Sequence, residues 1–272
     1  MRLATWNVNS LRARLPLVER WIADAQPDVL CLQETKLADD SFPAGFFADI
    51  GYESVHHGNG PWNGVAIVSR VGLEVPCRGS DSAPAQLVPS LSELDRETRL
   101  VTARCAGIEV ACVYVPNGRA VGSEHYGAKL KWLDALRRLL AAEDPSRRDV
   151  VVCGDFNVAP SDLDVFDPAA LAGATHVTPE ERGALQSLLD LGFDDALRSL
   201  YPDTGGIYSW WDYRGGSFHK GLGMRIDLIL ASRPVMGRVE WALIDRNARR
   251  GQGSKTEPQP SDHAPVIIQL AG

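Results

Sequence analysis

The sequence lacks any apolar run that could span a membrane. A membrane-spanning helix needs about 20 consecutive apolar residues, and no run in the chain approaches that length. The first residues, MRLATWNVNS, read as a β-strand and show none of the charged start, long apolar middle and small-residue cleavage site of a signal peptide. We therefore expect a cytoplasmic protein with no membrane partner.

The five cysteines lack the spacing of a metal or redox motif. There is no CxxC, and no cysteine is combined with histidine at zinc-site spacing. Four of the five lie in apolar, strand-like runs, where a small, buried, reduced thiol is ordinary. We expect no catalytic or metal-binding role for these residues: Cys31, Cys77, Cys105, Cys112 and Cys153.

The chain also lacks the excess of basic residues that phosphate binding usually requires. Its formal net charge is −7, which argues mildly against a nucleic-acid partner. Two considerations weaken that objection, since a bound divalent metal adds positive charge and a local basic patch matters more than the sum. Candidates for such a patch are Arg12, Arg14, Arg119, Lys129, Lys131 and the stretch 246–255. Composition alone leaves the partner open.

No Gly/Ser linker and no clear repeat divides the chain, so we expect a single domain over residues 1–272. Strand-like apolar runs alternate with amphipathic segments. Predicted helices cover residues 17–25, 127–142 and 178–191, the last with a capping box formed by Thr178 and Glu181. Predicted strands are RLATWNV, VLCLQE, NGVAIVSR, TRLVTARC, IEVACVYV, VVVCGDFN, IYSWWDY, MRIDLILAS and APVIIQL. This pattern favours a four-layer α/β sandwich of two packed mixed β-sheets flanked by helices.

Short polar groups adjoin these apolar strands at six points. They are Asn7 with Asn9, Gln33 with Glu34, Tyr114 with Asn117, Asp155 with Asn157, Arg225 with Asp227, and Ser261 with Asp262 and His263. Loops at strand ends are where catalytic groups are usually placed. Any one group could instead be a helix cap or a turn former. Six together, nearly all carboxylate, amide or imidazole, indicate a catalytic site.

These residue types suit the hydrolysis of a phosphodiester. An enzyme can neutralise the phosphate with a hard cation and generate hydroxide close to phosphorus. Magnesium prefers oxygen ligands and usually takes one or two carboxylates. Glu34 and Asp262 can supply them, with Asn7 as a neutral oxygen ligand or positioner. Asp155 is a candidate general base, although two nearby carboxylates could exchange these roles.

His263 is the imidazole of this set. It can donate a hydrogen bond to a phosphate oxygen if a carboxylate orients its ring and keeps it charged, and Asp227 is the best candidate for that task. Arg225 reads as an ordinary salt-bridge partner. Three other histidines are expected at the surface: His125, His176 and His219.

Eight motifs in order along the chain resemble the set found in the exonuclease III family. They are WNVNSLR, LQETK, WNGVAI, VYVPNGR, GDFNVAP, SWWDYR, GMRIDLIL and SDHAPV, and they run from residue 6 to residue 266. The family belongs to the endonuclease/exonuclease/phosphatase fold. GDFN and SDH are shared across that wider superfamily, whereas VYVPNGR and WWDYR are narrower and indicate its DNA-repair branch.

The resemblance implies an apurinic/apyrimidinic endonuclease of base-excision repair with 3′–5′ exonuclease and 3′-end-trimming activities. The implied partner is double-stranded DNA, especially at abasic sites or 3′ ends. The implied cofactor is Mg²⁺, with Mn²⁺ as the alternative, and we expect a monomer. The balance between endonuclease and exonuclease activity and the number of metal ions stay open.

The resemblance also implies a role for each matching residue. Glu34 is the principal metal carboxylate, and the implied metal site comprises Asn7, Glu34, Asp155, Asn157, Asp262 and His263. Asp155 lies next to the attacking water, Asn157 stabilises the transition state and Tyr114 reaches the phosphate. The implied catalytic set is Tyr114, Asp155, Asn157, Asp227 and His263, and the substrate contacts are Asn117, Arg119, Trp210, Met224 and Ile226.

Trp210, Met224 and Ile226 would wall a pocket for a flipped abasic sugar, from which a normal nucleotide is excluded by its base. Trp210 and Trp211 are adjacent and point to opposite faces of a strand, so at most one of them lines the pocket. The remaining tryptophans are expected in packing: Trp6, Trp21, Trp62, Trp132 and Trp241.

Three segments depart from the family pattern. Residues 56–60, HHGNG, stand where many relatives carry a lysine. Residues 76–94 match no motif and read as a mobile surface loop rich in Ser, Pro and Ala. Residues 252–259 form a longer stretch before SDH than is usual in the family.

Two other interpretations compete. The first is a phosphodiesterase of the same fold with another substrate, such as a phosphoinositide, a sphingomyelin or non-specific DNA. Many of those proteins carry a second catalytic histidine where this chain has Tyr114, which favours DNA repair. The second is a catalytically dead module that binds DNA or a protein. Against it stands the intact set Glu34, Asp155, Asn157, Asp227 and His263.

Overall fold

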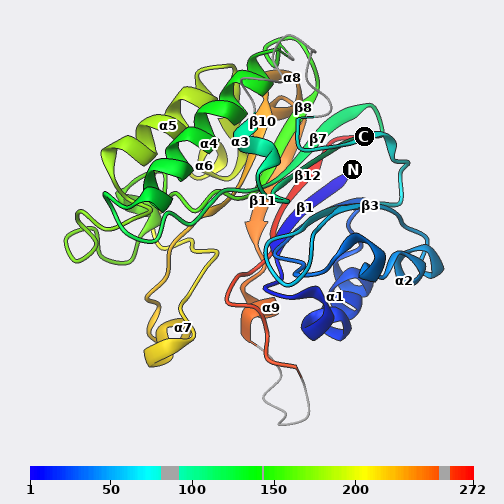
Figure 1. Ribbon diagram of the computed structural model, residues 1–272, viewed down its shortest axis with the longest axis horizontal. Helices are drawn as coiled ribbons and strands as arrows, with labels where there is room; N and C mark the ends of the chain where they lie inside the picture. The colour runs from blue at the N-terminus through cyan, green and yellow to red at the C-terminus, as the bar shows by residue number, and fades with distance from the viewer. Residues whose placement is uncertain (81–91, 143, 251–257) are drawn as a thin grey trace.

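Two six-stranded β-sheets pack face to face in the computed structural model, which describes residues 1–80, 92–142, 144–250 and 258–272 (Figure 1). The first sheet contains, in spatial order, β11 (Val239–Ile244), β12 (Val266–Leu270), β1 (Arg2–Asn7), β2 (Val29–Gln33), β4 (Val65–Ser69) and β3 (Glu53–His57). The second contains β5 (Glu74–Arg78), β6 (Leu100–Cys105), β7 (Ile108–Tyr114), β8 (Val150–Asp155), β10 (Asp227–Ser232) and β9 (Phe193–Asp195).

Each sheet mixes parallel and antiparallel pairs. β1 and β2 are parallel, as are β7 and β8, whereas β12 runs antiparallel to β1 and β10 antiparallel to β8. The predicted four-layer α/β sandwich of mixed sheets is therefore confirmed.

Helices cover the two outer faces. α1 (Leu11–Ala25) and α2 (Ala44–Asp49) lie beside the first sheet, and α4 (Glu124–Ala141) and α5 (Pro179–Leu189) lie on the second (Figure 1). Shorter helices are α3 (Ser92–Asp95), α6 (Ala196–Leu200), α7 (Ser217–Lys220), α8 (Arg233–Met236) and α9 (Arg246–Arg250). α7 and α9 project beyond one end of the sandwich (Figure 1). No helix in the described part of the chain is long and apolar enough to span a membrane.

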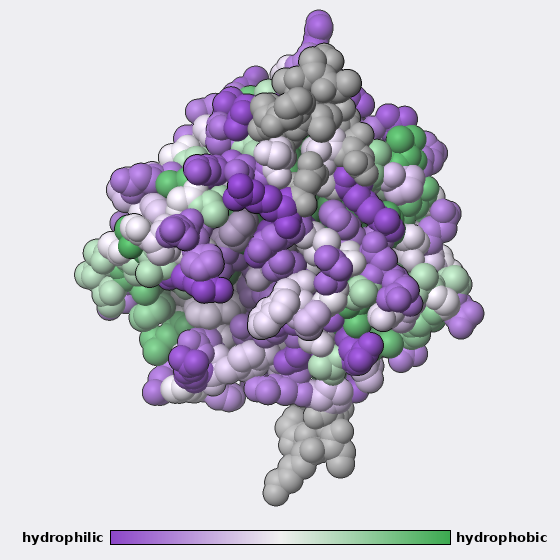
Figure 2. All heavy atoms as spheres, in the orientation of Figure 1, coloured by the Kyte–Doolittle hydropathy of each residue, from purple (hydrophilic) through white to green (hydrophobic). Residues whose placement is uncertain are grey.

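Three apolar layers hold this arrangement together. One lies between the sheets and includes Leu3, Ile67, Val110 and Ile229. The second packs α4 and α5 on one sheet, and the third packs α1 and α2 on the other. Burial of both faces explains why the central strands read as continuous apolar runs. On the side of the molecule seen in Figure 1, polar side chains cover most of the surface and apolar residues gather in small areas near the margins (Figure 2).

The first helix begins earlier than predicted. α1 starts at Leu11 and contains Pro16, whereas the predicted helix began after that proline. Ser10 makes no side-chain cap, and no acidic residue lies in the first turn. The backbone N–H groups of Ser10 and Leu11 instead donate to the carbonyls of Glu34 and Thr35, at 2.7 and 3.0 Å. The start of α1 is thus determined by a neighbouring loop, which no local pattern shows.

Two other local predictions were wrong. IYSWWDY forms no strand, because its only ladder contacts are isolated bridges from Trp210 to Met224 and to His263. The segment 76–94 was predicted as one loop, but β5 extends to Arg78 and α3 begins at Ser92. Its residues 81–91, and residues 251–257 of the long stretch before SDH, lie outside the described part. The capping box at Thr178 is present as predicted.

Candidate active site

Strand direction brings the polar groups to one end of both sheets. Asn7 and Gln33 end the parallel strands β1 and β2 in register, so Glu34 follows at the same edge. Tyr114 and Asp155 end the parallel strands β7 and β8 in register. Asp227 begins the antiparallel strand β10 directly opposite Asp155. The polar strand ends of both sheets therefore lie together at one end of the sandwich.

The amide of Asn7 connects the carboxylates of the two sheets. Its Nδ2 donates to Glu34 Oε1 at 2.9 Å and to Asp155 Oδ2 at 3.0 Å. Its own side-chain oxygen accepts from the backbone N–H of Asn9 at 3.0 Å. In this arrangement Asn7 positions both carboxylates, and its oxygen is already engaged.

Glu34 is kept ionised by a neighbouring lysine. Its Oε2 lies 2.9 Å from Lys36 Nζ, which also donates to Asn9 Oδ1 at 2.5 Å. Burial alone would raise the pKa of Glu34, but the charge of Lys36 and the Asn7 hydrogen bond lower it below its ordinary value. Both Glu34 and Lys36 have positive φ, 50° and 54°, so the loop after β2 turns sharply here.

Asp227 and His263 form a buried ion pair. His263 Nδ1 lies 2.8 Å from Asp227 Oδ2, which also accepts from Ser209 Oγ at 2.6 Å. Burial opposes the charge on the ring, but the adjacent Asp227 carboxylate overcomes it and raises the pKa of His263 to about 10. The ring is therefore a protonated donor at neutral pH, with Nε2 directed toward Asp155 Oδ2 at 3.8 Å.

Asp155 has the environment of a base. Burial and the negative charge of Asp227 raise the pKa of Asp155 to about 7, although His263 and Asn7 oppose that shift. Its Oδ1 accepts from the backbone N–H of Asn157 at 2.9 Å. A carboxyl group whose pKa lies near neutrality can exchange a proton with water at physiological pH.

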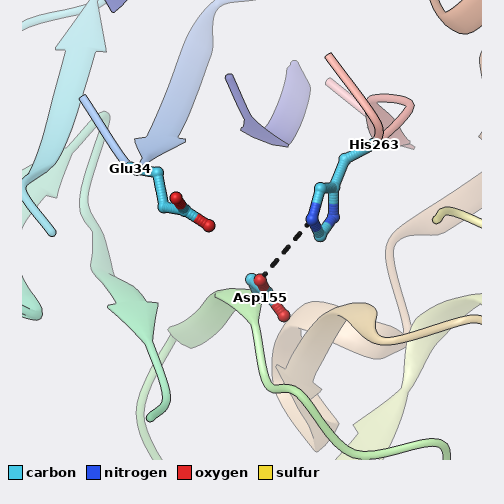
Figure 3. Close-up of side chains that lie close together, drawn as sticks. All are labelled: Glu34, Asp155 and His263. Carbon is cyan, nitrogen blue, oxygen red and sulfur yellow. Dashed lines mark ion pairs between the residues drawn. The ribbon is translucent and has the colours of Figure 1, made fainter. Parts of the chain in front are cut away.

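Glu34, Asp155 and His263 converge from three segments (Figure 3). One potential ligand atom from each lies within 4.8 Å of the others, the geometry of a possible metal site. The two carboxylates fit a hard divalent cation, because such ions prefer oxygen donors. The protonated ring of His263 fits less well as a ligand, since a metal requires the neutral imidazole.

Asp262 occupies a neighbouring position. Its two carboxylate oxygens accept from Asn9 Nδ2 at 3.0 Å and from Trp210 Nε1 at 3.1 Å. Burial opposes its ionisation, but the charge of His263 and these hydrogen bonds lower its pKa. The structure thus links Asp262 to the Trp210 side chain, beside the three converging groups.

Tyr114 and Asn157 border the same site. The Tyr114 ring lies under the Arg99 guanidinium at 4.5 Å, and burial together with the charges of Glu34 and Asp155 holds the pKa of its phenol well above its usual value. Asn157 Nδ2 donates to Val115 O at 3.0 Å, and its Oδ1 accepts from Asn117 Nδ2 at 3.1 Å.

The predicted substrate contacts divide into two regions. Asn117 and Arg119 are exposed on the loop after β7. Met224 and Ile226 are buried with Val165, and the half-buried Trp210 packs against them as a wall. Trp211 turns the other way and packs against Phe218, so only one of the two tryptophans belongs to this wall.

Three single-residue predictions were wrong, because the surroundings of each side chain depend on distant parts of the chain. Trp62 was expected in packing but is 76% exposed. His176 was expected at the surface, yet it is half-buried and its Nδ1 lies 2.5 Å from Asn157 O. Burial and the charge of Lys129 lower the pKa of His176 to about 4, so its ring is neutral. Lys129 was a candidate for a DNA-binding patch but is fully buried.

Sequence reasoning also left two residues of the site without a role. Lys36 and Asn9 lie within the quoted motifs LQETK and WNVNSLR, so the signal was present. Their function as partners of Glu34 and Asp262 became visible only with the structure. The cysteines are free thiols, and four of the five are buried as expected.

The family of this chain follows from its similarity to known proteins. The model of the Endonuclease/Exonuclease/phosphatase family matches residues 4–263. The chain belongs to this family. It is similar to exodeoxyribonuclease III of Haemophilus influenzae, with 34% identity over 99% of this chain and 100% of the relative. It is also similar to an exodeoxyribonuclease of Bacillus subtilis, with 32% identity over 98% of each chain. The resemblance to the exonuclease III family is therefore confirmed.

Two solved structures are similar to this chain over its full length. One is the 3′ phosphatase NExo from Neisseria bound to a product DNA hairpin, and the other is an AP endonuclease from Archaeoglobus fulgidus. Each has a TM-score of 0.90 and 38% sequence identity, with complete coverage of both chains.

Proposed function

We propose that this protein is a Mg²⁺-dependent DNA phosphodiesterase that breaks the bond between phosphorus and a 3′ oxygen in duplex DNA. Its substrates are abasic sites, where it cuts on the 5′ side, and blocked or ordinary 3′ ends. The observation that carries this proposal is the convergence of an ionised Glu34, a poised Asp155 and a charged His263 at one end of the sandwich. These activities share one chemistry, because each releases a 3′-hydroxyl group.

The chain's own residues divide the work at the scissile phosphate. Asp155, with a pKa near 7, accepts the proton of the attacking water. The protonated His263, held by Asp227, donates a hydrogen bond to a non-bridging oxygen as negative charge grows there. Tyr114 remains a neutral phenol and offers a second donor. Asn157 offers the remaining N–H of its side-chain amide to the same charge, since Nδ2 also donates to Val115 O.

Glu34 would hold the divalent cation together with an oxygen of Asp155, with Asp262 beside it. When bound, the cation supplies positive charge to the phosphate and the leaving oxygen. Asn7 spaces the two carboxylates, and Lys36 keeps Glu34 ionised and oriented. A second arrangement, in which Glu34 and Asp155 exchange roles, uses the same two carboxylates.

Metal binding should depend on pH in a way that separates the roles of Asp155 and His263. Protonated Asp155 cannot hold a cation, so metal affinity should fall about tenfold per pH unit as the pH drops below about 7. His263 stays protonated up to about pH 10 and keeps its proton if it serves only as a donor. Calorimetric titration with Mn²⁺ in buffers of different ionisation enthalpy should therefore show no proton release at pH 8.5. Release of about one proton there would make His263 a metal ligand.

The wall residue Trp210 offers a test of substrate selection. Trp210→Ala removes the indole face and should relax discrimination against normal nucleotides more than it slows cleavage at an abasic site, by about tenfold in the ratio of kcat/KM values. Trp210→Phe keeps an aromatic wall but removes the N–H that bonds Asp262, so it should preserve discrimination. Equal loss on every substrate in Trp210→Ala would contradict a role in the pocket.

A substrate panel tests the proposal against its rivals. The protein should nick a duplex with one abasic site in Mg²⁺ and should leave phosphoinositides and sphingomyelin intact. No nicking with either Mg²⁺ or Mn²⁺ would sink the abasic assignment. A duplex ending in a 3′-phosphate belongs in the same panel, because the similar NExo structure is that of a 3′ phosphatase. Activity on that substrate alone would restrict the enzyme to 3′ ends.

A further inference from the structure

Lys129 lies where a lysine is rarely found. It belongs to the apolar face of α4, on the same side as Tyr126, Trp132 and Leu136, and its side chain is fully buried. Among the lysines in the described part of the chain it alone is buried. Placing a charged ammonium group in the interior is costly unless every donor finds a partner. Its surroundings must therefore account for its presence.

The ammonium group of Lys129 has three donors, and three acceptors surround it. Nζ donates to the carbonyl oxygen of Asn157 at 2.6 Å, to the carboxylate of Glu181, and to the carbonyl oxygen of Asn117 at 3.4 Å. Glu181 neutralises the charge from the first turn of α5. The contact with the Asn157 carbonyl is shorter than the contact with the Asn117 carbonyl. The position of Asn157 should therefore depend on Lys129 more strongly than that of Asn117 does.

Glu181 is itself held in place. Its Oε1 accepts from Thr175 Oγ1 at 2.9 Å, and its Oε2 accepts from the backbone N–H and the hydroxyl of Thr178 at 3.2 and 2.8 Å. The Thr178 hydroxyl lies 2.7 Å from the Tyr126 hydroxyl on α4. The ion pair and its hydrogen bonds thus join α4, α5 and the loop before α5 into one support behind the site.

The residue that this support holds is unusual in its backbone. Asn157 has a φ of 51°, a left-handed conformation that costs free energy for any residue with a side chain. Its carbonyl oxygen is close to both Lys129 Nζ and His176 Nδ1, at 2.6 and 2.5 Å. The loop after β7 packs equally tightly, since a Cβ atom on Gly118 would lie only 3.0 Å from Lys129 Cδ.

We propose that Lys129 is a positioning residue for the active site. Its ammonium group holds the backbone of Asn157, and with it the side-chain amide that Val115 O and Asn117 Nδ2 orient at the border of the site. This inference rests on the proposed function of the site, because it assigns Lys129 to the same reaction. Lys129 acts through Asn157, lies behind it, and touches no substrate.

The test separates positioning from mere support of the fold by comparing three variants. Lys129→Met alone leaves Glu181 buried without its cation, so it should lower the Tm as well as activity. The double variant Lys129→Met/Glu181→Gln removes both charges while keeping the shape, and it should recover most of the Tm. Glu181→Gln alone keeps the ammonium group and an oxygen acceptor for it, but it leaves the buried cation without its carboxylate and should also lower the Tm.

On abasic or 3′-phosphate duplex, whichever the wild type cleaves faster, the double variant should lose about 10- to 100-fold in kcat. Its KM should stay within about threefold of the wild-type value. Glu181→Gln should lose much less kcat than either variant without the lysine. A stable double variant with wild-type kcat, or a loss confined to KM, would overturn the proposal. If the wild type itself cleaves no DNA, the proposed function is wrong. If the wild type cleaves DNA and the stable double variant does so equally well, the function stands and the positioning role of Lys129 is wrong.

Discussion

Asp155→Asn should abolish cleavage while leaving DNA binding intact. The substitution keeps the shape of the side chain and an oxygen that can accept the backbone N–H of Asn157. It removes the proton acceptor with a pKa of about 7 and one carboxylate of the possible metal group. General-base catalysis alone contributes about 10²- to 10⁴-fold, so a loss in kcat of at least about 10³-fold is expected.

The affinity of Asp155→Asn for DNA should be measured together with its activity. Removing a negative charge next to the phosphate should leave the Kd for abasic duplex equal to or lower than that of the wild type, as read by fluorescence anisotropy. Asp134→Asn is the matched control, because Asp134 is half exposed on α4 and pairs with Arg138 there. Its activity should equal that of the wild type. Loss of DNA binding by Asp155→Asn would show that Asp155 has a different role.

Asp227→Asn should give the second largest loss, of about 10²- to 10³-fold in kcat at pH 8. The buried carboxylate of Asp227 is what raises the pKa of His263 to about 10. Without that charge, burial would lower the pKa of the ring, which would then be neutral at pH 8 and a poorer donor to the phosphate.

The pH–rate profile of the same variant shows whether this cause is correct. In the wild type the alkaline limb should lie near pH 10, where His263 loses its proton, and the acidic limb no higher than about pH 7, where Asp155 gains one. Asp227 raises both pKa values, so its removal should move both limbs to lower pH. The loss of activity should therefore be smaller at pH 6 than at pH 8.

Ser209→Ala provides the comparison for Asp227→Asn. It removes the 2.6 Å hydrogen bond to Asp227 Oδ2 but leaves the carboxylate and its charge. The acidic and alkaline limbs of the pH–rate profile should stay nearly in place, and kcat should fall by about tenfold or less. If Ser209→Ala shifted the profile as much as Asp227→Asn, the hydrogen-bond network and not the charge would control His263.

The parts of the site that sequence could predict are those determined locally. Asp155 and Asn157 directly follow a buried apolar run, and the parallel or antiparallel direction of a strand decides which end they occupy. Residue chemistry made Asp227 the best candidate for the partner of His263, and the structure places their side chains 2.8 Å apart. The mixed two-sheet architecture followed from the alternation of apolar runs and amphipathic helices.

The parts that sequence could not predict depend on contacts between distant segments. Asn7 is either a ligand or a spacer according to which way its amide turns, and that depends on two carboxylates from different sheets. Lys129 reads as a surface charge until Glu181 and the Asn157 carbonyl are placed beside it. His176 is drawn inward by the same carbonyl. Propensity and motif contain no information on such encounters.

The product of a single cleavage reaction tests the central claim most directly. Wild-type protein, Mg²⁺ and a duplex with one abasic site are incubated in water enriched in ¹⁸O. The masses of both fragments of the cleaved strand are then measured by mass spectrometry. Hydrolysis at phosphorus should leave a 3′-hydroxyl group on the upstream fragment and one ¹⁸O atom in the 5′-phosphate of the downstream fragment, and chelation of the metal should stop the reaction. An upstream fragment that ends in an unsaturated sugar, or a 5′-phosphate without ¹⁸O, would contradict the account.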